Sequence, residues 1–169
     1  MKKLLLIVLL LLIGLKNFSQ SESISFRLDA IDISRYEIGD TLYISCYCDD
    51  ISDDITGWQI YFLFDTEVLS YIGIKYKQSQ MTGNWYENCI GNMWAANWLD
   101  PTFKGIELFD GEKLFELTFI YNGGETNLSW SRETINESGK LVKGETMVID
   151  TKFKPFELNL RDGCVCKKN

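Results

Sequence analysis

The chain has 169 residues, a formal net charge of −7, 14% aromatic residues and no histidine. So acidic a chain repels phosphate backbones, which excludes nucleic acid as an expected partner. Without histidine it lacks the commonest general base and the commonest zinc ligand, and it carries no P-loop or dinucleotide-binding glycine motif. We therefore expect no enzyme, cofactor or metal site, although the 24 acidic residues leave carboxylate pairs open.

The N-terminal residues 1–19 are predicted to form a cleavable signal peptide. Lys2 and Lys3 give a basic start, the run from Leu4 to Leu15 is almost entirely apolar, and polar residues follow. This run is about a dozen residues long, whereas a membrane span needs roughly 20. A buried core helix is the alternative. The mature chain is therefore expected to be secreted, to the periplasm, the cell surface or the medium, with no membrane span.

Short segments in which apolar and polar residues alternate follow the signal peptide. This period of two is typical of β-strands. In the segment 55–65, for example, Trp58 and Phe62 share one face and Tyr61 lies on the other. The expected strands cover 23–31, 41–48, 55–65, 68–76, one or two strands within 85–98, 113–121, 127–131, 146–151 and 156–160. The pattern predicts one all-β domain over 20–162, an antiparallel sandwich of about nine strands.

Three of these segments resemble the strands of cohesin domains. The segment from Gly39 to Ser45 resembles their early strand, where Gly-Asp precedes alternating apolar residues. The segment from Gly57 to Leu69 resembles their third strand and its turn, where an aromatic-Asp pair precedes Val-Leu. The segment from Asp110 to Phe119 resembles their late hairpin. The resemblance implies a nine-stranded jelly-roll β-sandwich, in a superfamily that also contains carbohydrate-binding modules.

The same resemblance implies a non-catalytic binding module. Cohesins grip dockerin modules in polysaccharide-degrading assemblies, so the implied partner is a dockerin-like protein module or a polysaccharide. The chain resembles secreted single-domain proteins of Bacteroidetes, because its signal peptide ends in Asn17-Phe18-Ser19-Gln20. Unlike a scaffoldin, it has one domain and no repeats. The alternatives are a small glycan-active enzyme on a jelly-roll scaffold and a structural envelope protein.

Two groups of side chains are candidate binding sites. Gln59, Tyr61 and Leu63 have outward parity on the strand whose face meets the dockerin in cohesins, and they form the candidate protein-binding site unless a neighbouring segment covers them. The candidate carbohydrate-binding residues are Trp85, Tyr86 and Trp98, whose rings could stack on sugars or close the end of the sandwich. The inward aromatic residues are expected to form the core; they are Trp58, Phe62, Phe64, Trp94, Phe115 and Phe119.

The five cysteines permit disulfide bonds in a secreted chain, and their odd number leaves at least one thiol free. Cys46 and Cys48 face inward on their strand, while Cys164 and Cys166 fall in a short polar tail, 163–169. A tail cysteine could bridge to Cys48 or Cys89 and hold the C-terminus. The acidic segment 49–54 lacks the spacing of a calcium loop, so it is expected to be a solvated loop.

Overall fold

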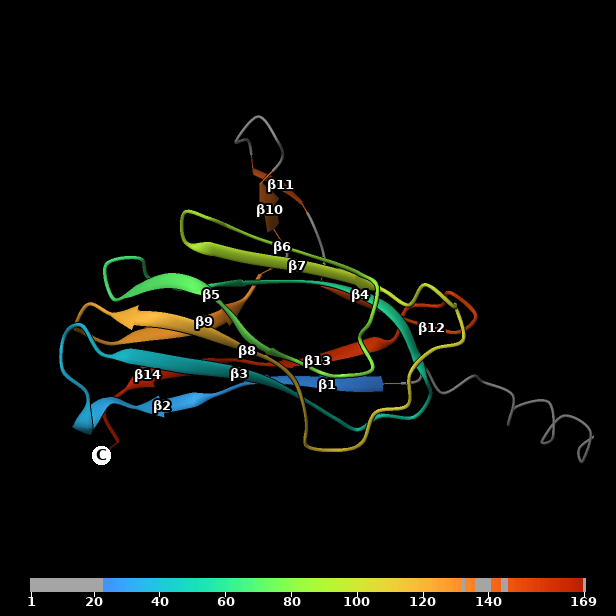
Figure 1. The fold of residues 1–169 in the computed structure, drawn as a ribbon, viewed down its shortest axis with the longest axis horizontal. Helices are drawn as coiled ribbons and strands as arrows, with labels where there is room; N and C mark the ends of the chain where they lie inside the picture. The colour runs from blue at the N-terminus through green and yellow to red at the C-terminus, as the bar shows by residue number, and fades with distance from the viewer. Residues whose placement is uncertain (1–22, 132, 136–140, 144–145, 169) are drawn as a thin grey trace, which may run out of the picture.

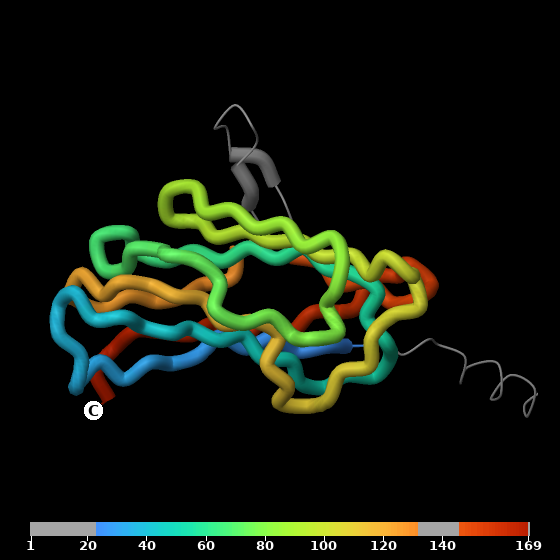
Figure 2. The backbone as a smooth tube through the Cα atoms, viewed as in Figure 1, coloured from blue at the N-terminus to red at the C-terminus, as the bar shows by residue number. Residues whose placement is uncertain are grey.

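Alternating apolar residues give each strand one face to bury, and two sheets bury these faces against each other (Figure 1). The computed structural model describes residues 23–131, 133–135, 141–143 and 146–168. The predicted signal peptide, 1–19, lies outside the described residues. Within the described part of the chain, no helix is long and apolar enough to cross a membrane. The strands run along the long axis, and most connections gather at the two ends of the sandwich (Figure 2).

The first sheet has five strands, with β13 and β5 at its two edges. In spatial order they are β13 (Glu157–Arg161), β1 (Ser23–Leu28), β3 (Thr41–Asp49), β8 (Glu112–Tyr121) and β5 (Leu69–Lys77). All neighbours pair antiparallel except β1 and β13, which are parallel.

The second sheet has seven strands, and β4 lies near its middle. Its main path is β2 (Ala30–Asp32), β14 (Gly163–Cys166), β9 (Thr126–Trp130), β4 (Ile55–Leu63), β7 (Met93–Leu99) and β6 (Asn84–Ile90). The seventh strand, β12 (Met147–Asp150), pairs with the first half of β4, whereas β9 pairs with its end. A separate pair is formed by β10 (Glu133–Ile135) and β11 (Leu141–Lys143), and a short 3-10 turn spans Ile33–Arg35.

Aromatic rings fill the space between the two sheets. Trp94 of β7 lies 4.9 Å from Phe115 of β8 and 5.3 Å from Phe62 of β4, measured between ring centroids. All six aromatic residues expected in the core are buried. Cys46 and Cys48 are buried on the same side of β3, as the alternation predicted. The predicted all-β sandwich is thus confirmed.

Two details differ from the sequence expectation. Fourteen strands are described, rather than about nine, because several are too short to show a period of two. The residues expected in a polar tail from 163 instead begin with strand β14, which pairs parallel with β2 and antiparallel with β9. Val165 is fully buried there. A strand of four residues is recognisable only when its partners are in place.

Candidate partner-binding face

Strand β4 carries the candidate protein-binding residues in a row on the side away from the core. Gln59, Tyr61 and Leu63 are partly buried, and they alternate with the fully buried Ile60 and Phe62. The parity assigned from the sequence is therefore correct. On the edge of β4 that faces away from β7, the backbone of Tyr61 forms two hydrogen bonds. Its amide donates to Thr146 Oγ1 at 3.3 Å, and its carbonyl accepts from the Ser131 amide at 2.8 Å.

Three neighbouring strands extend this row into a broad surface. In the register of the sheet, Gln59 lies between Met147 of β12 and Asn97 of β7, and Asn97 in turn faces Tyr86 of β6. We call the outward residues of these four strands the outer face. It comprises Gly57, Gln59, Tyr61, Leu63, Asn84, Tyr86, Asn88, Ile90, Met93, Ala95, Asn97, Leu99, Met147 and Ile149.

A shallow hollow of about 130 Å³ lies in the outer face between two tyrosines. Ala95 forms its floor because it stands opposite Tyr61 on one side and Asn88 on the other, and its side chain is the smallest in that row. Tyr86 stands at the far rim with 64% of its surface exposed. A partner side chain could enter this hollow between the two rings, which is how anchor residues are usually held.

No side chain of the outer face is charged, although charged residues make up 24% of the chain. The face combines apolar side chains such as Ile90 and Met147 with the amides of Gln59, Asn88 and Asn97. Charged residues are depleted from the cores of protein interfaces, because desolvating them costs free energy. This composition suits contact with another protein better than permanent exposure to water.

A hydrogen-bond network beneath β6 holds the edge of the outer face in place. The Glu87 carboxylate accepts from the Tyr71 hydroxyl at 2.7 Å and from Trp85 Nε1 at 2.8 Å. Burial, followed by the bond to Glu87, raises the pKa of Tyr71, so its hydroxyl stays a donor. The network links edge strand β6 to β5 of the other sheet and thereby fixes the position of Tyr86.

The three candidate carbohydrate-binding residues do not form one site. Trp98 is only 2% exposed, and its Nε1 donates to the Thr82 carbonyl. Trp85 pairs with Trp98 across β6 and β7 and packs on the Trp58 ring at 5.1 Å. Tyr86 points the opposite way, to the outer face, because adjacent residues of a strand alternate. Of the two readings of these rings, the burial of Trp98 and the packing of Trp85 favour closing the sandwich for both tryptophans.

The acidic loop and the hollows of the described surface offer little for metal or acid chemistry. Asp49 lies 3.6 Å from Arg27, Asp50 lies 3.7 Å from Arg161, and Asp53 pairs with a lysine. Within the described residues, no three His, Cys, Asp or Glu side chains gather into a possible metal site. Two further hollows, along 63–66 and 155–160, each contain one carboxylate rather than a pair.

The structure pairs Cys164 with Cys166, two residues apart in β14, and leaves Cys46, Cys48 and Cys89 as free thiols. The structure does not contain the expected bridge from the C-terminus to Cys48 or Cys89. Cys48 is enclosed between the two sheets, and burial, followed by the nearby Glu112 charge, raises the pKa of its thiol to about 12. Cys46 and Cys48 are core residues, whereas Cys89 is partly buried at the edge of the core.

Sequence reasoning missed most of the outer face. It named Gln59, Tyr61 and Leu63, but it did not place Ala95, Asn97 or Met147 beside them, and it assigned Tyr86 to another site. The alternation of residues along β7 could have identified two of them, because Trp94 and Trp98 face inward and Ala95 and Asn97 must then face outward. The order of strands in the sheet, which makes them one surface, was not readable from any local pattern.

Comparison with solved structures identifies the fold. The sixth cohesin of scaffoldin B from Acetivibrio cellulolyticus, solved in complex with a dockerin, matches with a TM-score of 0.68 at 17% identity, over 86% of this chain and 99% of that one. The non-cellulosomal cohesin of Archaeoglobus fulgidus matches with a TM-score of 0.66 at 12% identity, over 86% and 92%. A type III cohesin from Ruminococcus flavefaciens matches with a TM-score of 0.61 at 9% identity, over 87% of both chains.

No family model and no curated protein matches the sequence. Identities this low establish the fold alone, and function must be argued from the residues of this chain. The protein therefore has the cohesin fold, a jelly-roll β-sandwich, as the resemblance implied.

Proposed function

We propose that this protein is a secreted, non-catalytic module that captures a partner protein on the outer face of β12, β4, β7 and β6. The observation that carries the proposal is the absence of charge across all fourteen outward residues of that face. The cohesins with which the chain shares its fold include two solved as complexes with dockerins. A dockerin-like protein module is therefore the partner that we propose.

The geometry of the face supports a protein ligand over a sugar. Its two rings, Tyr61 and Tyr86, flank the hollow and are accompanied by aliphatic side chains and amides, whereas Trp85 and Trp98 point into the core. The hollow over Ala95 would admit one side chain of a partner, while the surrounding amides would donate and accept hydrogen bonds. A role in extracellular polysaccharide degradation would then come through the captured partner.

The test is a binding assay with the immobilised chain. The probes are a panel of purified dockerin modules and, separately, an insoluble polysaccharide. We expect capture of a dockerin module, and we expect Tyr61→Ala and Tyr86→Ala each to weaken it by about thirtyfold, which corresponds to about 2 kcal/mol. Tyr43→Ala is the matched control, because Tyr43 is similarly exposed on the opposite sheet.

The outcomes separate the alternatives. Retention of polysaccharide, lost with Tyr86→Ala and without capture of any dockerin module, would replace the proposal with carbohydrate binding. Equal losses in the Tyr43→Ala control would mean that the outer face is not the site. Failure to capture any dockerin module or polysaccharide would contradict the proposal as a whole.

A further inference from the structure

A second apolar surface lies at one end of the sandwich, where two loops carry the same short pattern. Residues 100–104 read Asp-Pro-Thr-Phe-Lys and residues 150–154 read Asp-Thr-Lys-Phe-Lys. The loops follow β7 and β12, and they bring Phe103 and Phe153 together with ring centroids 5.8 Å apart. We call these two residues, with Lys104, Lys152 and Lys154, the twin-Phe tip.

A buried aspartate anchors each loop. Asp100 accepts hydrogen bonds from the backbone amides of Thr102 and Gly105, both at 2.9 Å, and from the Thr102 hydroxyl. Asp150 accepts from the amides of Lys152 at 2.7 Å and Lys154 at 2.8 Å. Both carboxylates are nearly fully buried. The two loops are thus built in the same way and are held rigidly from below.

Both phenylalanines are displayed to solvent at a cost in backbone conformation. Phe103 and Phe153 adopt positive φ angles of 55° and 60°, which residues with a Cβ rarely do. The two rings contact each other, yet 50% and 57% of their residue surfaces remain exposed. A turn at positive φ does not favour phenylalanine, so this exposed pair is a candidate contact for a ligand outside the domain.

The charges exposed on these two loops are all positive, in a chain whose net charge is −7. Lys104, Lys152 and Lys154 are exposed, whereas the aspartates of the loops are buried. Lys152 has a long contact of 4.0 Å with the partly buried Asp53. In the described part of the chain Lys104 and Lys154 form no ion pair. The tip therefore combines protruding rings with cations free to meet anionic groups.

The chain enters the domain at this same end. Ser23, the first residue of β1, pairs with Glu157, which follows the second loop by only a few residues. The start of β1 therefore lies near the second of the two loops. The apolar run from Leu4 to Leu15 lies upstream of Ser23 in the sequence.

We propose that the twin-Phe tip docks the protein on a phospholipid surface that contains anionic lipid. Phe103 and Phe153 insert at the boundary of headgroups and acyl chains, and the three lysines contact lipid phosphates, as amphipathic elements do at membranes. A lysine can lay its flexible aliphatic stem along an apolar surface while its ammonium group stays in the polar headgroup layer.

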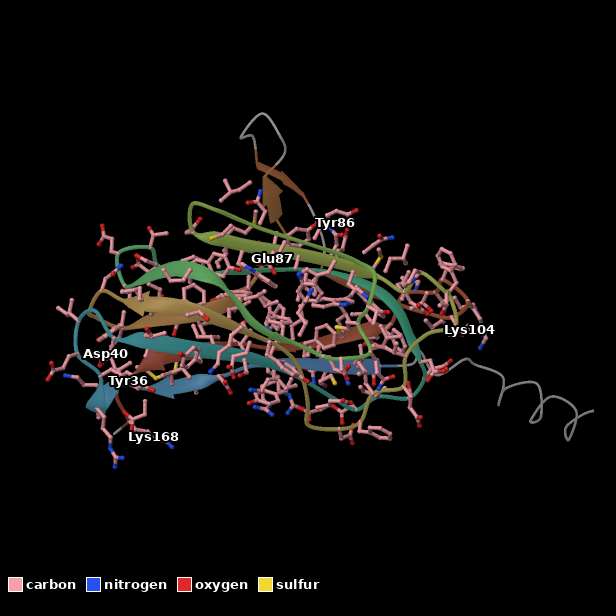
Figure 3. All side chains as sticks on the ribbon, viewed as in Figure 1. Tyr36, Asp40, Tyr86, Glu87, Lys104 and Lys168 are labelled. Carbon is pink, nitrogen blue, oxygen red and sulfur yellow. A yellow bond between two sulfur atoms is a disulfide. The ribbon has the colours of Figure 1, made fainter. Side chains whose placement is uncertain are left out.

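Two other ligands fit the tip less well. The planes of the two rings meet at 52°, so they offer no flat platform for a sugar. The rings also protrude, and neither lines any of the hollows described above, so a protein partner would have to supply the entire pocket. The tip lies apart from Tyr86 of the outer face, as the positions of Lys104 and Tyr86 show (Figure 3). Tyr86 and the tip are therefore separate points of contact.

The test is vesicle co-sedimentation with a chain that begins at Gln20. Such a chain keeps every described strand and core residue and lacks the apolar leader, which would bind lipid itself. The vesicles are phosphatidylcholine alone and phosphatidylcholine with a quarter phosphatidylglycerol. We expect binding to the anionic vesicles, weakened at least about tenfold by the double change Phe103→Ser and Phe153→Ser. Lys104→Gln and Lys154→Gln should each weaken it about fivefold.

Ile72→Ser is the matched control, because Ile72 is 60% exposed on β5, outside the two loops. It should leave vesicle binding unchanged. Thermal melts of all variants establish that each is folded. The proposal is overturned if the unaltered chain does not bind anionic vesicles, if the double variant binds as well as the unaltered chain, or if Ile72→Ser causes the same loss. Loss of a protein ligand in the double variant, with no vesicle binding by any chain, would assign the tip to a protein instead.

Discussion

Trp58 of β4 and Phe115 of β8 stack across the two sheets, with their ring centroids 5.6 Å apart and their planes 10° from parallel. Phe115 also packs against Trp85 and Trp94, so three rings of the second sheet meet this one ring of the first. The outer face is the other side of the strands that these tryptophans occupy. Loss of Phe115 would consequently disturb both the core and the support of the candidate site.

Phe115→Ala should lower the free energy of unfolding by about 3–5 kcal/mol, from lost transfer energy and the cavity left behind. Urea unfolding monitored by tryptophan fluorescence measures it. Phe109→Ala is the control, because Phe109 is 62% exposed and its truncation should cost less than about 0.5 kcal/mol. Similar losses in the two variants would mean that the sheets do not meet at Phe115.

Ala95→Glu should abolish partner capture while leaving the fold intact. The new carboxylate would occupy the floor of the hollow between Tyr61 and Tyr86 and would be desolvated by any ligand that covers it. We expect at least about thirtyfold weaker binding in the dockerin assay, as for loss of an interface anchor. Thr41→Glu, at the exposed start of β3 on the other sheet, adds the same charge elsewhere and should have no effect.

Asp100→Asn should destabilise the protein at neutral pH but not in strong acid. Burial acts to raise the pKa of Asp100, but the hydrogen bonds from Thr102 and Gly105 outweigh it and leave the pKa below 3.8. A carboxyl with a lowered folded pKa stabilises above the unfolded pKa, about 3.9, and this stabilisation is lost as pH falls through the folded value.

The melting temperatures of the two proteins should therefore differ at pH 7, approach each other below the unfolded pKa of Asp and converge below the lowered pKa of folded Asp100. A constant difference across the whole pH range would show that the anion is not what holds the loop of Phe103. Asp110→Asn serves as the comparison, since Asp110 is an exposed carboxylate on another loop.

Thiol titration should find three reactive thiols in the unfolded, unreduced protein, because Cys164 and Cys166 are paired and the other three cysteines are free. In the folded protein Cys48 should stay unreactive at pH 8, since its pKa of about 12 keeps it protonated and the sheets exclude the reagent. Five thiols after unfolding would mean that no bridge forms.

Reduction of the Cys164–Cys166 bridge should have a small effect on stability. The bridge spans only two residues of sequence, and in the chain-entropy description so short a loop contributes only about 1–2 kcal/mol. A bridge from the C-terminus to Cys48 or Cys89 would contribute more, because it would close a much longer loop. A large drop in melting temperature on reduction would therefore favour the long-range pairing.

The sequence by itself determined which residues of each long strand face the core. Alternation is local: once Trp58, Ile60 and Phe62 are assigned to one face of β4, Gln59 and Tyr61 must lie on the other. It also predicted the all-β class and, through the resemblance of three segments, the cohesin fold. These inferences held because they depend on neighbours in the chain or on the order of motifs along it.

Only the tertiary structure decided what lies beside those residues. Trp98 pairs with Trp85 inside the sandwich, and Ala95 and Tyr86 lie beside Tyr61 on the outer face. Phe103 contacts Phe153, which lies in a loop about 50 residues later in the sequence. Each contact depends on strand order and register, which are set by the packing of the whole core rather than by any segment. The alternation of residues along a single strand therefore cannot predict a candidate binding surface that is assembled from four strands.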